Sequence, residues 1–473
     1  MTTDPYKNDK EGIKELLRQF EGLRSGRASI FLEEESFEKI IDHFDDEEEF
    51  GKALEAAEMS IEYFPFSSSL LIRKADILLS LRNYRAALES LDRAETFDAT
   101  DINLYILKTD AYLALDKQDK AVTVLEDAIA RFSGQEKIEL LFELADVYDD
   151  YEEFDKVFDC LLIILQEDPG NEEALYKICF WTDFTGRNEE SIRLHLQIIE
   201  DSPYNELAWF NLGAAYQGLK LYEKAIDAYQ YAVVIDEKFD YAYRNIGDAY
   251  IRLRKYKEAI ESLEKVLELS KPEEVIYEAI GHCYDRLKNF AQARFHYRKA
   301  SHLNPDNSKL YYKIASTYYN EEQWVSAVKQ LESALKISRL QADYNLLMGE
   351  CKLQLGLYKE AISFFSTVVR TKPKNVAGWE ALIRCLLSAK YLSEAKTQVL
   401  AALEHTNNKP IFFYYLSSVL FAVGKSKEAL IQLEKAIQLS PKALNKFVAL
   451  HPSILQNQQV VDIIARNKRG RSK

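Results

Sequence analysis

The stretch of sequence that decides the fold runs from residue 206 to 239 and reads ELAWFNLGAAYQGLKLYEKAIDAYQYAVVIDEKF. Counted from Glu206, the fourth residue is Trp, the seventh and eighth are Leu and Gly, and the eleventh is Tyr. The twentieth and twenty-seventh residues are Ala, with Tyr at the twenty-fourth place between them. The next two blocks of 34 residues, which begin at Asp240 and Glu274, repeat this arrangement. A block of this length that resembles its neighbours predicts a repeat array rather than one globular core.

The same frame extends over residues 34–443 and divides them into twelve repeats. The repeats begin at residues 34, 68, 102, 138, 172, 206, 240, 274, 308, 342, 376 and 410, with one two-residue insertion around 133–135. Place twenty is Ala in ten of the twelve, and place thirty-two is Pro in six, where it marks the end of a helix. Each repeat is therefore expected to hold two antiparallel helices. Small residues at places eight, twenty and twenty-seven let the two backbones approach closely.

A large residue followed by Leu-Gly, Tyr, Ala, an aromatic residue, Ala and Pro resembles the pattern of the tetratricopeptide repeat. The resemblance covers residues 34–443. It implies an all-α fold, a right-handed superhelical solenoid of antiparallel helix pairs. One pair cannot bury its own apolar faces, so stacked neighbours must form a continuous core.

The two ends of the chain are expected to cap this array. Residues 1–33 should form a lead-in helix and a loop, because apolar residues with helical spacing precede Ser25-Gly26, namely Ile13, Leu16, Leu17 and Phe20. Residues 444–465 should form capping helices through Phe447, Leu450, Ile454, Val461 and Ile464. Residues 466–473, RNKRGRSK, have no apolar side chain and are predicted to be a basic disordered tail.

Charge and composition narrow the classes of partner. The net charge is −15, from 61 basic and 76 acidic residues, which disfavours nucleic acid and anionic membranes as ligands. The first residues lack a signal-peptide pattern, and no apolar segment is long enough to enter a membrane. We therefore expect a cytoplasmic protein. The five scattered cysteines lack metal or disulfide spacing and predict reduced thiols.

The sequence contains no complete catalytic or cofactor-binding motif of a known class. The strongest candidate is Gly281-His282-Cys283, since a His next to a Cys can bind a metal or form a catalytic pair. Cys283, Cys351 and Cys385 share the tenth place of three repeats, however, so packing is the favoured interpretation. The acidic run at residues 45–49 is interpreted as a solvated turn, because it lacks the spacing of a calcium loop. We expect no catalytic residue, no cofactor and no metal site.

The resemblance also implies where a ligand binds. In this family the first helix of each repeat lines a concave groove, and places two, five, nine, twelve and thirteen face it. In the first five repeats these places carry thirteen acidic residues and no basic one: Glu35, Glu38, Asp42, Asp45, Asp46, Asp76, Asp110, Glu139, Asp146, Asp149, Asp150, Glu173 and Asp183. Four aromatic residues join them: Phe142, Tyr176, Phe180 and Phe184. The acidic lining either attracts a basic ligand or is a solvated surface, and the bases at the adjoining place six, Lys39, Arg73 and Lys177, reduce its charge.

Further along the groove, Asn211 and Asn245 share place six of adjacent repeats, and Arg244 precedes Asn245. Family members use such Asn side chains to hold a peptide backbone, so these three residues complete the set of candidate ligand-binding residues. The sequence thus favours a non-catalytic scaffold that binds a partner protein or an extended peptide of basic character. The alternative is a substrate-recognition subunit of a separate transferase or protease. RNA binding is disfavoured by the sign of the charge. The oligomeric state is left open.

Overall fold

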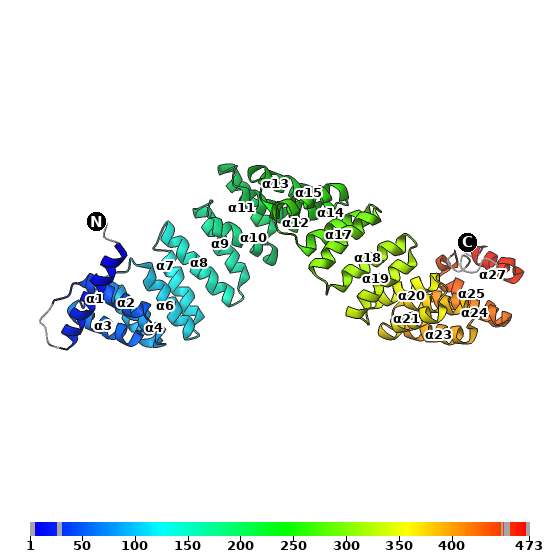
Figure 1. Cartoon of the computed structure of the whole chain (residues 1–473), viewed down its shortest axis with the longest axis horizontal. Helices are drawn as coiled ribbons and strands as arrows, with labels where there is room; N and C mark the ends of the chain where they lie inside the picture. Colours follow the sequence, from blue (N-terminus) through cyan, green and yellow to red (C-terminus); the bar gives the residue numbers. More distant parts are fainter. Residues whose placement is uncertain (1–4, 26–30, 446–447, 449–454, 470–473) are drawn as a thin grey trace. The chain divides into compact units, whose positions relative to one another are not determined.

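The computed structural model describes residues 5–25, 31–445, 448 and 455–469. All of its secondary structure is helical, and helices α2 to α25 form twelve successive pairs (Figure 1). We call the first and second helix of each repeat its A helix and its B helix. The A helices are α2 (Glu34–Asp46), α4 (Ser68–Ser80), α6 (Ile102–Ala114), α8 (Gln135–Asp150), α10 (Glu172–Thr185), α12 (Glu206–Gly218), α14 (Asp240–Arg252), α16 (Glu274–Arg286), α18 (Ser308–Asn320), α20 (Ala342–Gln354), α22 (Val376–Ser388) and α24 (Pro410–Ala422).

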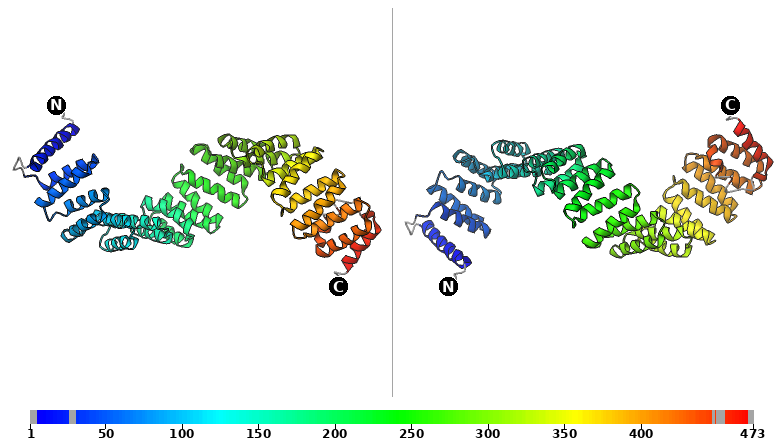
Figure 2. Two further views of the ribbon diagram at one scale, coloured as in Figure 1. Left: turned by 90° about the horizontal axis from the view of Figure 1, so that it is seen from below. Right: turned by 90° about the horizontal axis from the view of Figure 1, so that it is seen from above.

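The B helices follow their A helices after short turns. They are α3 (Phe50–Tyr63), α5 (Tyr84–Phe97), α7 (Gln118–Ile129), α9 (Phe154–Glu167), α11 (Asn188–Asp201), α13 (Tyr222–Ile235), α15 (Tyr256–Leu269), α17 (Phe290–Leu303), α19 (Trp324–Ile337), α21 (Tyr358–Thr371), α23 (Leu392–His405) and α25 (Ser426–Leu439). The chain divides into an N-terminal unit, Met1–Glu237, and a C-terminal unit, Lys238–Lys473. Within each unit, most A helices pack against their own B helix and against the preceding B helix (Figure 2). The predicted all-helical array of stacked pairs is confirmed, while the handedness of a superhelix stays a prediction.

The ends of the helices have local causes. Several A helices begin after a side chain that caps their first turn, as Asn205 does by accepting a hydrogen bond from the backbone N–H of Ala208 at 2.9 Å. Each A helix is followed within two residues by a residue with positive φ at place fifteen: Glu48, Arg82, Asp116, Glu152, Gly186, Lys220, Arg254, Lys288, Glu322, Gly356, Lys390 and Gly424. This left-handed residue turns the chain toward the B helix and pairs the last free carbonyl groups. In α2, for example, the N–H of Glu49 donates to the carbonyl of Phe44 at 2.7 Å.

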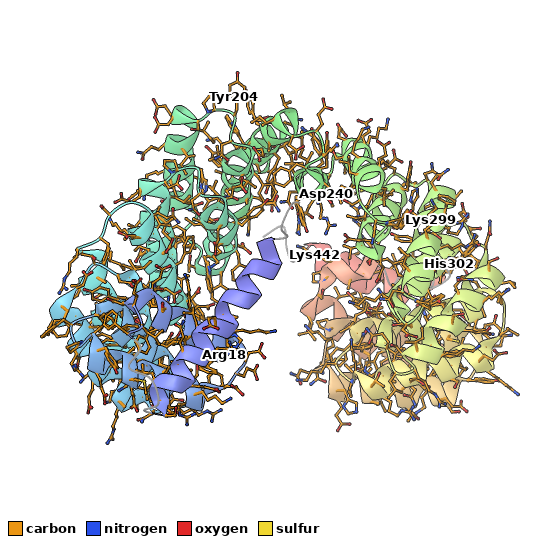
Figure 3. The ribbon with its side chains drawn as sticks, turned by 60° about the vertical axis from the view of Figure 1, so that its left-hand side comes forward. Arg18, Tyr204, Asp240, Lys299, His302 and Lys442 are labelled. Atoms are coloured by element: carbon orange, nitrogen blue, oxygen red, sulfur yellow. The ribbon has the colours of Figure 1, made fainter. Side chains whose placement is uncertain are left out.

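Close approach of the two helices in a pair depends on the predicted small residues. The Ala at place twenty is fully buried in ten repeats, as in Ala225 and Ala259. At place eight, Gly213 lies against the ring of Tyr229, and an added Cβ would be 2.6 Å from that ring. The B helices present polar residues outward, as Lys299 and His302 do on α17 (Figure 3). Sequence and packing therefore agree on which helix faces are buried.

The lead-in helix is α1 (Pro5–Arg24), which is longer than the apolar spacing alone requires. Its Phe20 is buried and meets the ring of Phe37 edge-on, with ring centroids 6.5 Å apart. The ring of Phe44, two turns further along α2, has its centroid 6.1 Å from that of Phe20. The helix thus covers the apolar face of the first repeat.

The C-terminal segment differs in detail from the expectation. A short 3-10 helix, η1 (Pro441–Ala443), follows α25, and α27 (Gln458–Arg469) packs on α25. In α27 the buried residue is Val460, with Ile464 half-buried beside it, whereas Val461 is exposed. The predicted contacts of Phe447, Leu450 and Ile454 lie outside the described residues.

The start of the predicted disordered tail is also wrong. Helix α27 continues to Arg469, and therefore includes residues 466–469 of the segment expected to be a tail. Residues 466–469 therefore continue the backbone of α27.

Candidate functional site

In the N-terminal unit the A helices form a continuous surface. Neighbouring A helices touch one another, α2 with α4, α4 with α6, and α6 with α8. In the part of the chain that the structure describes, B helices of neighbouring repeats approach each other less closely. The A helices therefore form the tighter side of the stack, which we call the inner face. The same holds in the C-terminal unit for α18, α20, α22 and α24.

Some of the predicted inner-face acids are neutralised by bases at place six. Lys39 Nζ lies 2.7 Å from Glu35 Oε1, and this ion pair lowers the pKa of Glu35. Arg73 pairs with Asp42, and its Nε lies 3.8 Å from Glu38 Oε1. The second of these links crosses from α4 to α2, so it ties adjacent repeats together.

A third base acts further along the face. Lys177 on α10 pairs with Glu173 at 2.9 Å and with Asp146 on α8 at 3.8 Å. The same ammonium lies 4.9 Å from the ring centroid of Phe142, a cation–π distance. The predicted residues Phe142 and Asp146 are therefore brought together, and they already share one cation.

Four other carboxylates form a row across four successive A helices. We call Asp45, Asp76, Asp110 and Glu143 the acidic ladder. Burial raises the pKa of each of the four carboxyls, and neighbouring carboxylates raise it further, Asp45 acting on Asp76, Asp76 on Asp110, and Asp110 on Glu143. Among the described residues none of the four takes part in an ion pair, although Arg73 and Lys177 lie near enough to lower the pKa values of Asp76 and Glu143 in part.

Glu143 was missed by the sequence analysis. It occupies place six, which adjoins the five predicted groove places and at which the sequence pattern draws attention to bases. The signal was present, since Lys39, Arg73 and Lys177 share this place in other repeats. The side chains at place six therefore belong to the inner face in each of these repeats.

The other predicted acids of the N-terminal unit are at the surface. Glu139 accepts a hydrogen bond from the amide of Gln135 at 3.4 Å. Asp149, Asp150 and Asp183 are exposed and make no ion pair with any described residue. They extend the negative surface from the acidic ladder along α8 to α10.

Aromatic side chains lie beside these acids on α10. Tyr176, Phe180 and Phe184 follow each other at helical spacing and are 63%, 60% and 57% exposed. The rings of Phe180 and Phe184 are stacked with centroids 6.0 Å apart, and Phe184 meets Phe154 edge-on at 4.8 Å. Exposed aromatic rings in a continuous row are typical of a surface that contacts another protein.

The repeat that carries this row is also irregular. Helix α10 packs along α9 and α12 but touches its own partner α11 only briefly. Place eight is Cys179 and place twenty-seven is Ile198, where most other repeats have smaller residues. Larger side chains at these places keep the two helices of this pair apart. The place-twenty-four residue is His195, which is fully buried, and burial lowers its pKa to about 4.

The predicted peptide-holding residues belong to different units, Asn211 to the N-terminal unit and Arg244 and Asn245 to the C-terminal unit. Asn211 is buried, and its amide donates to the backbone carbonyl of Leu175 at 2.8 Å, so its assignment as a ligand-binding residue is wrong. The amide links α12 to α10 instead. Arg244 lies in the C-terminal unit and pairs with Glu273 at 2.7 Å, while Asn245 next to it is half-buried.

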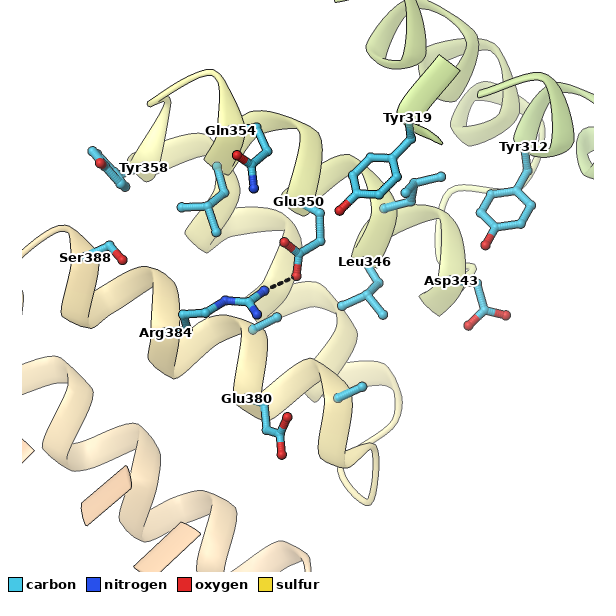
Figure 4. Close-up of a pocket in the computed structure, with 14 residues that line it drawn as sticks. Tyr312, Tyr319, Asp343, Leu346, Glu350, Gln354, Tyr358, Glu380, Arg384 and Ser388 are labelled. Carbon is cyan, nitrogen blue, oxygen red and sulfur yellow. Dashed lines mark hydrogen bonds and ion pairs between the residues drawn. The ribbon is translucent and has the colours of Figure 1, made fainter. Parts of the chain in front are cut away.

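The inner face of the C-terminal unit contains a hollow of about 740 Å³ between α18, α20 and α22. Tyr312 and Tyr319 point into it from α18, and Leu346 forms part of its floor (Figure 4). The ion pair between Glu350 and Arg384 crosses it from α20 to α22 (Figure 4). These residues occupy places five, nine and twelve, so the same places line the inner face here.

Reactive groups are buried rather than presented in this hollow. Cys283, Cys351 and Cys385 are fully buried, and burial raises the pKa of Cys283 to about 12, which keeps the thiol protonated. In the described ranges, no three His, Cys, Asp or Glu side chains are grouped as a metal site. Nor does any described helix have the length and apolar character needed to span a bilayer.

Comparison with known proteins agrees with this geometry. A tetratricopeptide repeat model matches residues 39–102. Two models from tetratricopeptide repeat protein 21, its C-terminal ARM domain and its second ARM domain, match residues 214–354 and 296–450. The chain is a tetratricopeptide repeat protein. Members of this family are generic protein-interaction scaffolds and are typically non-catalytic.

Several solved structures of the family resemble the chain at low sequence identity. YrrB, described as a tetratricopeptide repeat protein with an unusual peptide-binding site, is 19% identical over 40% of this chain and 96% of its own, with a TM-score of 0.36. A repeat protein from Cytophaga hutchinsonii is 17% identical over 54% and 99%, with a TM-score of 0.44. The Cut9–Hcn1 hetero-tetramer of the APC/C has a chain 15% identical over 82% and 90%, with a TM-score of 0.36. A search of curated proteins found no match.

Proposed function

We propose that the N-terminal unit of this tetratricopeptide repeat protein binds a basic segment of a partner protein along its inner face. The observation that carries the proposal is the acidic ladder. Its four carboxylates lie on successive A helices, Asp45 and Glu143 half-buried and Asp76 and Asp110 exposed, and desolvation and neighbouring carboxylates raise the pKa of each. Ionising them in the folded chain is unfavourable, and a cationic ligand relieves that cost.

The neighbouring ion pairs support this choice of residues. Lys39, Arg73 and Lys177 neutralise acids on either side of the ladder but do not pair with its members. The chain therefore holds bases close by and leaves Asp76 and Asp110 without one. A row of such carboxylates spaced one repeat apart suits an extended segment with several Lys or Arg side chains.

The experiment compares the replacement of two carboxylates of the acidic ladder by amides with the same replacement elsewhere on the N-terminal unit. The test variant is Asp76→Asn with Asp110→Asn, and the matched control is Glu89→Gln with Asp127→Asn, two exposed acids of B helices. Both variants change the net charge equally. Binding is measured by fluorescence anisotropy with a labelled, unstructured Lys- and Arg-rich peptide, and by surface capture of any partner that is purified, at low and high salt.

The ladder variant should bind on the order of tenfold more weakly than the control, with a slower association rate and a smaller salt dependence. Equal binding by the ladder variant, the control and the unchanged protein would mean that the inner face is only a solvated acidic surface. Equal weakening in both variants would mean that the peptide senses net charge alone. Either result contradicts the proposal.

A further inference from the structure

A second hollow lies on the opposite side of the C-terminal unit from the inner face. It is bordered by the B helices α19 and α21, by the outer side of α20, and by the turn that joins α19 to α20. Its volume is about 620 Å³, which is within the range of pockets that take a few side chains or a small ligand. We call this hollow the outer crevice.

The floor of the outer crevice is apolar and rigid. Leu335 from α19, Met348 from α20 and Phe364 from α21 line it, and all three belong to or pack on one buried cluster. Met348 is 2% exposed, so the floor is part of the core rather than a mobile surface. At the rim, Leu340 is 61% exposed. An apolar floor with an exposed apolar rim favours contact with another apolar side chain.

The rim of the outer crevice is predominantly basic, as is the C-terminal unit as a whole, which contains 37 Lys and Arg residues and 23 Asp and Glu residues. Lys336, Arg339 and Arg370 line it, and in the described structure none of them forms an ion pair with an acidic side chain. Lys352 is deeper in the crevice and is already neutralised by Glu360, whose Oε2 lies 2.8 Å from its Nζ. Glu332 is the other acidic residue of the lining, so four basic and two acidic side chains give the crevice a net positive charge.

The turn that supplies two of these residues departs from the repeat. At place thirty-two, where six other repeats have Pro, this repeat has Arg339, and Leu340 follows it. The turn is nevertheless held firmly, because the amide of buried Asn345 donates to the carbonyl oxygens of Arg339 at 2.9 Å and Gln341 at 2.8 Å. Arg339 and Leu340 are therefore presented by an ordered backbone, which reduces the entropy lost on binding.

We propose that the outer crevice binds an acidic, amphipathic segment of a partner protein. One large apolar side chain of that segment contacts Leu335, Met348 and Phe364, as anchor residues do at protein interfaces. Flanking Glu or Asp residues pair with Lys336, Arg339 and Arg370. The site is on a different unit from the acidic ladder and has the opposite charge preference, so the two proposals stand or fall separately.

The test uses the full chain and two labelled peptide probes, one of repeated Glu-Glu-Leu-Phe units and the other of repeated Lys-Lys-Leu-Phe units. The first variant is Arg339→Glu with Arg370→Glu, and the second is Leu340→Ser, which alters only an exposed side chain. The matched control is Lys257→Glu with Lys427→Glu, two exposed bases of the same unit. Circular dichroism and sedimentation velocity establish that each variant is folded and report its oligomeric state.

The acidic probe should bind the unchanged protein and the control, and about tenfold more weakly to the double Arg variant. Leu340→Ser should weaken it several-fold without changing its salt dependence, since that substitution removes an apolar contact. The proposal is overturned if the acidic probe does not bind the unchanged protein, or if the control variant weakens its binding as much as the double Arg variant does. It is also overturned if the basic probe competes equally well for the site. Self-association of the chain that disappears in the double Arg variant would also overturn it, because the occupant would then be a second copy.

Discussion

The close approach of the two helices of a repeat allows a specific prediction about one glycine. If Gly281 in α16 is changed to Ala, the added Cβ lies 2.7 Å from Cδ1 and 2.8 Å from Cε1 of Tyr297 in α17. Carbon atoms in favourable contact are about 3.5–4.0 Å apart, so the ring must move by about 1 Å. Tyr297 is only 1% exposed and has little room to do so. Overpacking of this kind costs about 1–3 kcal/mol, from which about 1 kcal/mol of improved helix propensity is recovered.

A matched substitution separates the two effects. Gly51→Ala is also in a helix, α3, but its Cβ meets no atom within 4 Å, so it should stabilise the protein by up to about 1 kcal/mol. The difference between the two substitutions, about 1–3 kcal/mol, is the packing effect alone. It is measured by urea unfolding followed by circular dichroism, with hydrogen exchange of α16 and α17 to locate the change.

A double-mutant cycle completes the test. In a Tyr297→Ala background the ring is gone, and Gly281→Ala should become neutral or stabilising. The same destabilisation in both backgrounds would refute the reasoning, because the ring could not then be the cause. An effect of Gly281→Ala equal to that of Gly51→Ala would refute it as well.

Three further predictions concern other features of the fold. Asp76→Asn with Asp110→Asn should raise the unfolding free energy at neutral pH by roughly 0.5–1 kcal/mol. Burial first, and then neighbouring carboxylates, raise the pKa of both carboxyls in the folded state. The unchanged protein should therefore lose stability relative to the variant as the pH rises from about 4 to 7, which urea titrations at each pH measure. Glu152→Gly should stabilise the protein by about 1 kcal/mol in the same assay, because Glu152 has a φ of 60° that only Gly adopts without strain; no change would mean that the turn is relaxed. Deleting residues 458–473 should destabilise the C-terminal unit by about 1.5–3 kcal/mol, because the apolar side chains that fully buried Val460 covers become exposed. An unchanged melting temperature would show that α27 does not act as a cap.

The two proposed sites also suggest how a scaffold of this kind brings proteins together. The acidic ladder and the outer crevice are on different units and select opposite charges. On these two proposals, a basic and an acidic partner occupy separate sites. A mixed experiment with the basic and acidic peptides should show independent binding to the unchanged protein, with each site affected only by its own variants.

What the sequence determined by itself is the part of the fold that depends on short-range spacing. The positions of Gly213, Tyr229 and Ala225 in one repeat establish where two helices of a pair approach, because all three belong to the same 34 residues. The same argument applies in each repeat, so every further repeat supports the same 34-residue spacing. For this reason the helix pairs could be predicted from spacing, whereas the places expected to line the inner face were implied by the resemblance to the tetratricopeptide repeat.

What only the tertiary structure decided depends on contacts between repeats. Asn211 is turned inward by its hydrogen bond to Leu175, which is 36 residues away, and Glu143 joins the acidic ladder because Asp110 lies beside it on another helix. Lys336, Arg339 and Arg370 form one basic rim although a whole A helix separates them in the chain. No periodic pattern encodes such neighbours, since the stacking of one helix pair on the next selects them. Charge in this protein is therefore readable as composition from the sequence, but as binding surfaces only from the packed structure.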